Sequence, residues 1–248
     1  MKIVVFLNGE YNYSMEFIKT ITEKAFVLCA DGGANASFRY GVMPNKIIGD
    51  LDSIEPEILN SYKRLNVEIQ KYPVEKDFSD FELILNMIKE NTVFNDSEVI
   101  ILGSSGGRTD YIINNLMLLE GTKNVTMITE NEEIYYRDEP FVIENREEAR
   151  VSFISLDDTI MNMTLKGFKY SIENKLIRRN TSQLVSNQVI SKKAEVLFDK
   201  GKMLVIIEKT LWKSVFFVCL HIFNLKSKTF FIKIFEKIID FSFKKIYY

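Results

Sequence analysis

Acidic residues stand directly after short apolar runs in this sequence. Asp50 and Asp52 follow the run KII and a glycine, and Asp31 follows the run AFVLCA. Like charges this close repel one another unless water, a cation or hydrogen-bond donors compensate. Two carboxylates at positions i and i+2 can both face one hard cation such as Mg²⁺, which takes oxygen ligands. A solvated turn is the alternative, and for Asp50 and Asp52 taken alone it is the better interpretation.

A further acidic segment, KDFSD, precedes the helical pattern FELILNMIKE. Ser79 with Glu82 predicts a capping box at the start of this helix, and Asp77 and Asp80 suit the positive end of the helix dipole. Capping explains these acids without catalysis. A capped helix start would also hold Asp80 rigidly as a third metal-binding carboxylate. Lys76, in the same segment, could bind a phosphate.

A glycine-rich segment, GSSGGRTD, lies between the apolar run EVIIL and the helical pattern DYIINNLMLLE. A loop between a strand and a helix presents backbone N–H groups to an anion, and Gly106 and Gly107 allow a close approach. Arg108 can make charge-assisted bonds to phosphate oxygens. The segment is neither a Walker A loop nor the dinucleotide-binding pattern. Because Arg108 and Asp110 stand at the helix start, anion binding is favoured over a plain tight turn.

Composition excludes several classes of function. The only histidine, His221, lies near the C-terminus, so a Ser-His pair, a histidine base and a His-rich metal site are excluded for the rest of the chain. Cys29 and Cys219 give neither a disulfide framework nor metal-ligand spacing, which favours a cytoplasmic location. Residues 1–209 carry a net charge of −7 and residues 210–248 a net charge of +5. An acidic body disfavours a nucleic-acid partner.

Apolar runs and amphipathic stretches alternate over the first 140 residues. Runs separated by helical patterns predict an α/β fold with a mainly parallel sheet and flanking helices. Ligands of such sheets bind at the carboxyl ends of the strands, and ADGGAN, GDLDS and GSSGGRTD all fall there. The predicted strands cover residues 3–8, 25–30, 46–49, 67–70, 98–103 and 125–129.

A smaller β-rich pattern begins near residue 134, and no long helical period follows before residue 209. We therefore predict an α/β domain at 1–138 and an all-β, sandwich-like domain at 139–209. Residues 210–248 form a basic, aromatic-rich tail whose apolar core is shorter than the ~20 residues of a membrane-spanning helix. An appended helix, or sequence foreign to the ancestral domain, is favoured over a membrane-surface helix, and no stable membrane insertion is expected.

The segments ADGGAN, GDLDS, KDFSDFE, GSSGGRTDYIINN, GFKYSIEN and VSN, in this order, resemble those of the thiamine pyrophosphokinase family. The resemblance spans residues 1–208. It implies an α/β catalytic domain, a β-sandwich-like domain and a homodimer with active sites between subunits. It also implies that ATP and thiamine react to give AMP and thiamine diphosphate.

By this resemblance the metal is bound by aspartates. Asp50 and Asp52 match the metal-binding pair of G-D-x-D-S, and Asp80 joins them, with Mg²⁺ as the expected ion. Asp77 supports the site, and Asp31 matches the acid of A-D-G-x-A-N near the active centre.

The resemblance also implies the substrate contacts. Arg108 and Asp110 match the loop around ATP and thiamine, and with the three metal aspartates they make up the catalytic set. Ser186 and Asn187 match the thiamine-facing S-N of the β-domain. Tyr111 departs from the family pattern, where a histidine is common, and Ser79 replaces a threonine but keeps the hydroxyl. Arg178 and Arg179 also depart from it, in a stretch that is usually apolar or glycine-rich.

Two other functions remain open from the sequence. One is an aspartyl-phosphate phosphohydrolase of the haloacid dehalogenase type, which also uses an Asp-x-Asp after a strand. That family places the pair after its first strand, whereas Asp50 follows the third predicted strand here. The other is a non-catalytic regulator that binds thiamine or a nucleotide.

Overall fold

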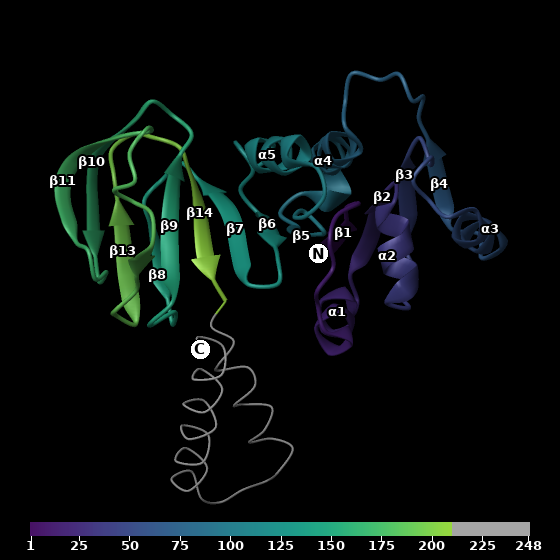
Figure 1. Cartoon of the computed structure of the whole chain (residues 1–248), viewed down its shortest axis with the longest axis horizontal. Coiled ribbons are helices and arrows are strands. Elements are labelled where there is room, and N and C mark those ends of the chain that lie inside the picture. Colours follow the sequence, from purple (N-terminus) through teal and green to yellow (C-terminus); the bar gives the residue numbers. More distant parts are fainter. Residues whose placement is uncertain (210–248) are drawn as a thin grey trace, which may run out of the picture. The chain divides into compact units, whose positions relative to one another are not determined.

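Ten strands form one continuous sheet in the computed structural model, which describes residues 1–209 (Figure 1). The strand order is β12-β9-β14-β7-β6-β5-β1-β2-β3-β4, and a second sheet has the order β11-β10-β13-β8. The predicted tail, 210–248, lies outside the described residues. Within residues 1–209, no helix has the length and apolar character needed to cross a membrane.

Six strands at one end of the large sheet, β6-β5-β1-β2-β3-β4, run parallel to one another. In β1, the consecutive residues Val4, Val5 and Phe6 are all fully buried, as expected where helices cover both faces of a parallel sheet. The elements of this half are β1 (Lys2–Phe6), α1 (Met15–Thr22), β2 (Phe26–Ala30), α2 (Gly33–Arg39), β3 (Lys46–Gly49), α3 (Pro56–Arg64), β4 (Glu68–Lys71), α4 (Asp80–Glu90), η1 (Thr92–Phe94), β5 (Glu98–Leu102), α5 (Thr109–Met117) and β6 (Val125–Ile128).

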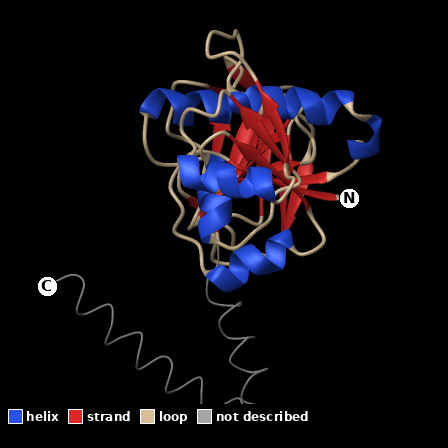
Figure 2. Ribbon diagram, turned by 90° about the vertical axis from the view of Figure 1, so that its right-hand side faces the viewer, coloured by secondary structure: helices blue, strands red, loops and turns tan. Residues whose placement is uncertain are grey.

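The helices divide between the two faces of this parallel sheet, and Figure 2 shows helices on both sides of the strands. Phe81 of α4 packs in one cluster with Val5, whereas Ile18 of α1 packs in another with Val4. Neighbouring residues of a strand point to opposite faces. Leu116 of α5 packs against the cluster of Val5. The chain therefore leaves β1 toward one face and leaves β5, through α5, toward the other. The crevice between the carboxyl ends of β1 and β5 is where ligands of such sheets bind.

The remaining strands are antiparallel and form a β-sandwich. One of its sheets continues the parallel sheet, because β7 pairs antiparallel with β6 and β14 pairs with β7. On β14, Met203 and Val205 pack in the sandwich core, while Leu204 points to the opposite face. These strands are β7 (Glu132–Arg137), β8 (Phe141–Glu144), β9 (Arg150–Ser155), β10 (Thr159–Lys166), β11 (Ile172–Arg178), β12 (Asn187–Gln188), β13 (Lys193–Leu197) and β14 (Met203–Glu208).

The predicted fold class is confirmed: helices flank a mainly parallel sheet, and a β-sandwich follows it. It was not predicted that the parallel strands and one layer of the β-sandwich would form a single sheet. The single sheet arises at the tight turn between β6 and β7, where the backbone N–H of Thr129 donates to the carbonyl of Glu132 at 2.9 Å. A turn this short makes the next strand antiparallel and keeps it in the same sheet.

Candidate active site

Three aspartates meet at the carboxyl ends of β2 and β3. Asp31 is the first residue after β2, and Asp50 and Asp52 follow β3, the parallel neighbour of β2. One carboxylate oxygen from each lies within 4.8 Å of the others. Asp31 is buried, Asp50 is half-buried and Asp52 is exposed, so this acidic group opens from the sheet edge toward solvent.

The backbone around the acidic group depends on a glycine. Asp31 has φ of 42° and Leu51 has φ of 73°, both in the left-handed region that non-glycine residues seldom adopt. Gly49 has φ of 152°, and a β-carbon there would lie 2.9 Å from Cβ of Asp31. Glycine at the end of β3 therefore lets the two strand ends come close enough for their carboxylates to group.

Lys76 connects the acidic group to a further aspartate at the start of α4. Its ammonium nitrogen lies 3.2 Å from Oδ2 of Asp50 and 3.2 Å from Oδ1 of Asp80. The Ser79 hydroxyl accepts a hydrogen bond from the backbone N–H of Glu82 at 3.2 Å. Ser79 therefore caps α4, as predicted. Asp77 is exposed beside this cap. The capped helix start holds Asp80 at the edge of the acidic group.

The pKa values at this edge show incomplete compensation of charge. Burial is the largest cause that raises the pKa of Asp31, and the charges of Asp50 and Asp52 add to it. Burial also raises the pKa of Asp80, although Lys76 opposes that effect. For Asp50, burial acts upward but is outweighed by hydrogen bonds from the Asp52 backbone and Lys76, so its pKa is lowered. Lys76 alone does not compensate all the carboxylates.

The donor set fits a divalent cation. Oδ1 of Asp31 is buried and has no hydrogen-bond partner among residues 1–209, a costly state for a carboxylate oxygen. Carboxylate oxygens are the ligands that hard cations such as Mg²⁺ take. Asp31, Asp50 and Asp52 are therefore the residues that could hold such an ion, and Asp80 pairs with Lys76 beside them.

The glycine-rich loop, residues 103–107, follows β5 and is interlocked with the segment after β1. The backbone N–H of Glu10 donates to the carbonyl of Ser105 at 2.8 Å. A β-carbon on Gly106 would lie 2.2 Å from Cγ of Glu10, and one on Gly9 would lie 2.1 Å from the carbonyl oxygen of Gly103. The segment after β1 was not among the predicted site residues, although LNGE repeats the pattern of an apolar run ending in a polar residue and glycine.

Arg108 and Asp110 lie together at the start of α5. The Arg108 guanidinium donates to both carboxylate oxygens of Asp110, at 3.1 and 2.6 Å, and lies 4.8 Å from the centre of the Tyr111 ring. All three side chains are exposed. Gly107, just before Arg108, has φ of 72°. The loop thus presents a flat, accessible cation at the carboxyl end of β5.

Ser186 and Asn187 lie far from the acidic group within one chain. Asn187 is buried and uses its carboxamide on Tyr170, whose backbone N–H it accepts at 3.0 Å and whose carbonyl it donates to at 2.8 Å. Ser186 is exposed. Strand β12, which begins at Asn187, stands seven positions from β2 in the sheet. At about 4.8 Å per strand this is a separation of roughly 34 Å from Asp31.

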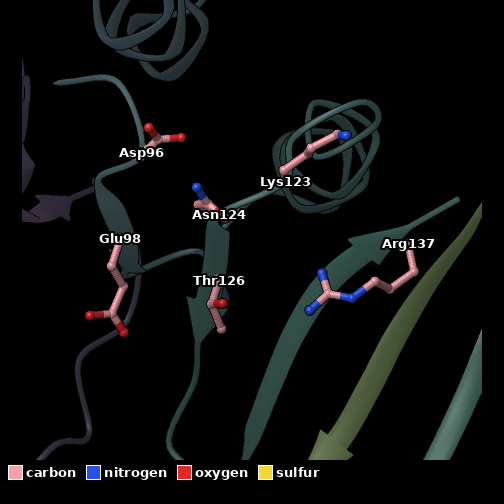
Figure 3. Close-up of a pocket in the computed structure, with 6 residues that line it drawn as sticks. All are labelled: Asp96, Glu98, Lys123, Asn124, Thr126 and Arg137. Atoms are coloured by element: carbon pink, nitrogen blue, oxygen red, sulfur yellow. The ribbon is translucent and has the colours of Figure 1, made fainter. Parts of the chain in front are cut away.

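An open pocket of about 290 Å³ lies at the other, amino-terminal edge of the parallel strands (Figure 3). It mixes acids and cations and contains none of the predicted site residues. It thus lies at the edge opposite the one that bears Asp31, Asp50 and Asp52. The pocket is lined by Asp96, Glu98, Lys123, Asn124, Thr126 and Arg137.

A cluster of carboxylates and a glycine-rich loop followed by an arginine lie at one edge of a parallel sheet, an arrangement typical of α/β enzymes that act on phosphates. Two family models match the chain: "Thiamin pyrophosphokinase, catalytic domain" over residues 17–129 and "Thiamin pyrophosphokinase, vitamin B1 binding domain" over residues 141–203. The chain belongs to the thiamin pyrophosphokinase family.

Named relatives and solved structures agree with this assignment. Thiamine pyrophosphokinase of Bacillus subtilis is 28% identical over 211 residues, which cover 82% of this chain and 97% of the relative. The crystal structure of thiamine pyrophosphokinase from Bacillus subtilis has a TM-score of 0.75 at 24% identity, covering 85% of this chain and all of that one. The yeast enzyme has a TM-score of 0.71 at 18% identity, covering 84% and 86%. These two structural likenesses concern the fold.

Proposed function

We propose that the acidic group and the glycine-rich loop together form the site at which this thiamine pyrophosphokinase works. The enzyme transfers the pyrophosphoryl group of ATP to the hydroxyl of thiamine and releases AMP. The observation that carries the proposal is the grouping of Asp31, Asp50 and Asp52 on the sheet edge that also bears this loop.

The cation that we propose for the acidic group is Mg²⁺. Asp50 and Asp52 would hold it, with Asp31 as a third carboxylate and Asp80 completing the set from α4. When bound, the ion supplies positive charge to the phosphate oxygens of ATP. Lys76 pairs with Asp50 and Asp80, and its ammonium would meet a phosphate of the nucleotide.

The reaction needs no histidine base, and residues 1–209 contain no histidine. The thiamine hydroxyl oxygen forms a bond to the β-phosphorus, and the bond from that phosphorus to the oxygen bridging the α-phosphorus breaks. AMP leaves with the bridging oxygen, and the hydroxyl proton passes to a carboxylate or to water. Arg108 adds positive charge at the phosphates, and Asp110 orients the hydroxyl. Transfer of this type depends mainly on positioning and charge neutralisation.

A homodimer would complete the thiamine site. Ser186 lies roughly 34 Å from Asp31 along one sheet, by strand spacing, so one chain cannot bring it to the acidic group. A second copy of the chain would place its Ser186 beside the acidic group of the first copy. Asn187 would hold the turn that presents Ser186. A dimer mass in light scattering, and inactivity of a monomeric variant, would support this arrangement.

The test of the function is AMP release from ATP that requires both thiamine and Mg²⁺. Thiamine-independent release of inorganic phosphate, with phosphate trapped on Asp50, would favour the phosphohydrolase instead. Binding of thiamine or nucleotide without turnover would favour the non-catalytic regulator.

Thiamine is a cation, which suits the acidic body of the protein.

We also propose two domains and a cellular location for the protein. We divide the described chain into a catalytic domain at 1–138 and a thiamine-binding domain at 139–209, supported by the two family models, which match on either side of residue 138. A cytoplasmic location is proposed from the cysteine usage, since Cys29 is free and buried. Limited proteolysis and cell fractionation would test the two statements.

A further inference from the structure

Asn8 lies between the acidic group and the glycine-rich loop. It follows β1, which stands between β5 and β2 in the sheet. The acidic group begins at the end of β2, and the glycine-rich loop begins at the end of β5. A polyphosphate that reaches from one to the other must pass over the end of β1, where Asn8 lies.

Two glycines set the position of Asn8. A β-carbon on Gly32 would lie 2.5 Å from Cγ and Oδ1 of Asn8 and 2.7 Å from its Nδ2, so the carboxamide occupies the space that a side chain would need. Gly32 directly follows Asp31. On the other side, Gly9 fits against the carbonyls of Gly103 and Ser105. The side chain of Asn8 is thus held beside the acidic group while its backbone is held beside the loop.

The carboxamide of Asn8 has hydrogen-bonding capacity to spare. The side chain is exposed, and it makes no hydrogen bond to any other residue in the described part of the chain. A primary amide offers two N–H donors and a carbonyl acceptor. The buried Asn187, by contrast, uses both ends of its carboxamide on the backbone of Tyr170.

We infer that Asn8 binds the polyphosphate of the nucleotide, donating from Nδ2 to a phosphate oxygen between the acidic group and the glycine-rich loop. This role rests on the proposed function, because it takes a nucleotide as the ligand of this edge. It makes Asn8 a substrate-binding residue on the strand that separates the metal carboxylates from the anion loop. Neither the fold nor the contact with Gly32 requires an N–H donor there.

The variant Asn8→Asp tests the donor, because aspartate keeps the shape that fits against Gly32 but offers only acceptors. The measurement is calorimetric binding of α,β-methylene ATP with Mg²⁺ in the absence of thiamine, since this analogue lacks the bond that breaks. Asn8→Ala is expected to weaken binding about tenfold by loss of the bond. Asn8→Asp is expected to weaken it further, because a carboxylate repels phosphate. The matched control is Asn60→Asp on α3, which should bind as the wild type does.

Binding of Mn²⁺ alone separates a phosphate contact from an effect on the acidic group. Asn8→Ala should bind Mn²⁺ as the wild type does, because no metal-binding carboxylate is removed. Nucleotide affinity of both Asn8 variants equal to that of the wild type would overturn the inference, even if the enzyme turns over thiamine. Equal losses for Mn²⁺ and nucleotide in Asn8→Ala would also overturn it, since Asn8 would then act through the acidic group. If the Asn8 variants lose nucleotide affinity as expected but the wild type releases no AMP that depends on thiamine, the proposed function fails and the Asn8 contact stands.

Discussion

The ammonium nitrogen of Lys76 lies 3.2 Å from Oδ2 of Asp50, and each of the two side chains is only 13% exposed. Lys76 pairs in the same way with Asp80. A partly buried cation between two carboxylates acts as an internal counter-ion. The burial of Lys76 lowers its pKa, but the bonds to Asp80 and Asp50 outweigh that effect and raise it, so Lys76 stays charged.

Replacement of Lys76 by methionine is expected to destabilise the metal-free protein by ~1–3 kcal/mol, because it leaves two partly buried carboxylates without their cation. Mg²⁺ should then stabilise the variant more than it stabilises the wild type, since the ion replaces lost positive charge. Urea unfolding with EDTA and with Mg²⁺ measures both effects.

The control for this prediction is Lys46→Met. Lys46 pairs with Glu68 at 2.8 Å, but Glu68 is 65% exposed and remains hydrated after the change. Its loss should cost less than ~1 kcal/mol and should not depend on Mg²⁺. An equal Mg²⁺ effect in the Lys76 variant and the wild type would show that no cation replaces Lys76.

The variant Asp52→Asn is expected to abolish turnover while leaving the fold intact. Asp52 is exposed, so no core packing is lost, and removal of one charge from a repelling group costs the metal-free protein nothing. The measurements are thiamine diphosphate formation and the thermal midpoint with EDTA. Asp96→Asn is the matched control, an exposed aspartate at the opposite sheet edge. Full activity of Asp52→Asn would remove Asp52 from the metal site.

The lowered pKa of Lys209 predicts that the stability of the protein depends on pH. Its ammonium donates to the carbonyl of Thr129 at 2.6 Å and lies 4.7 Å from the ring centre of Phe17. Burial lowers the pKa of Lys209 to about 8, with Arg146 acting in the same direction and Glu133 against it. The unfolded chain keeps the ordinary value of 10.5. Between pH 8 and pH 10.5 the unfolded state therefore binds more protons at this group than the folded state does. The contribution of Lys209 to the free energy of unfolding thus rises with pH.

Lys209→Met removes that titration. The free energy of unfolding of wild type minus that of the variant should therefore increase between pH 8 and 10, by ~1–2 kcal/mol after allowance for solvent screening. Urea unfolding at four pH values measures the difference, which cancels the other titrating groups. Lys202→Met is the control: bonds to Glu120 raise the pKa of this exposed lysine, so the difference should stay level. A level difference for Lys209 as well would contradict the prediction.

Local features could be predicted from the sequence because each depends on neighbouring residues. Apolar runs predicted all six parallel strands, and the spacing of Ser79 and Glu82 predicted the cap of α4. The segments rich in Asp, Gly and Ser fall at strand ends, as predicted, and three of their aspartates group there.

The sequence by itself therefore determined the fold class, the acidic strand ends and the glycine-rich loop. Only the tertiary structure decided which of these residues meet. The placement of β2 beside β3 brings Asp31 to Asp50, and that of β1 between β2 and β5 puts Asn8 between the acidic group and the loop. Strand order is set by packing of helices on both faces of the sheet, between residues distant in the chain, and no local pattern records it.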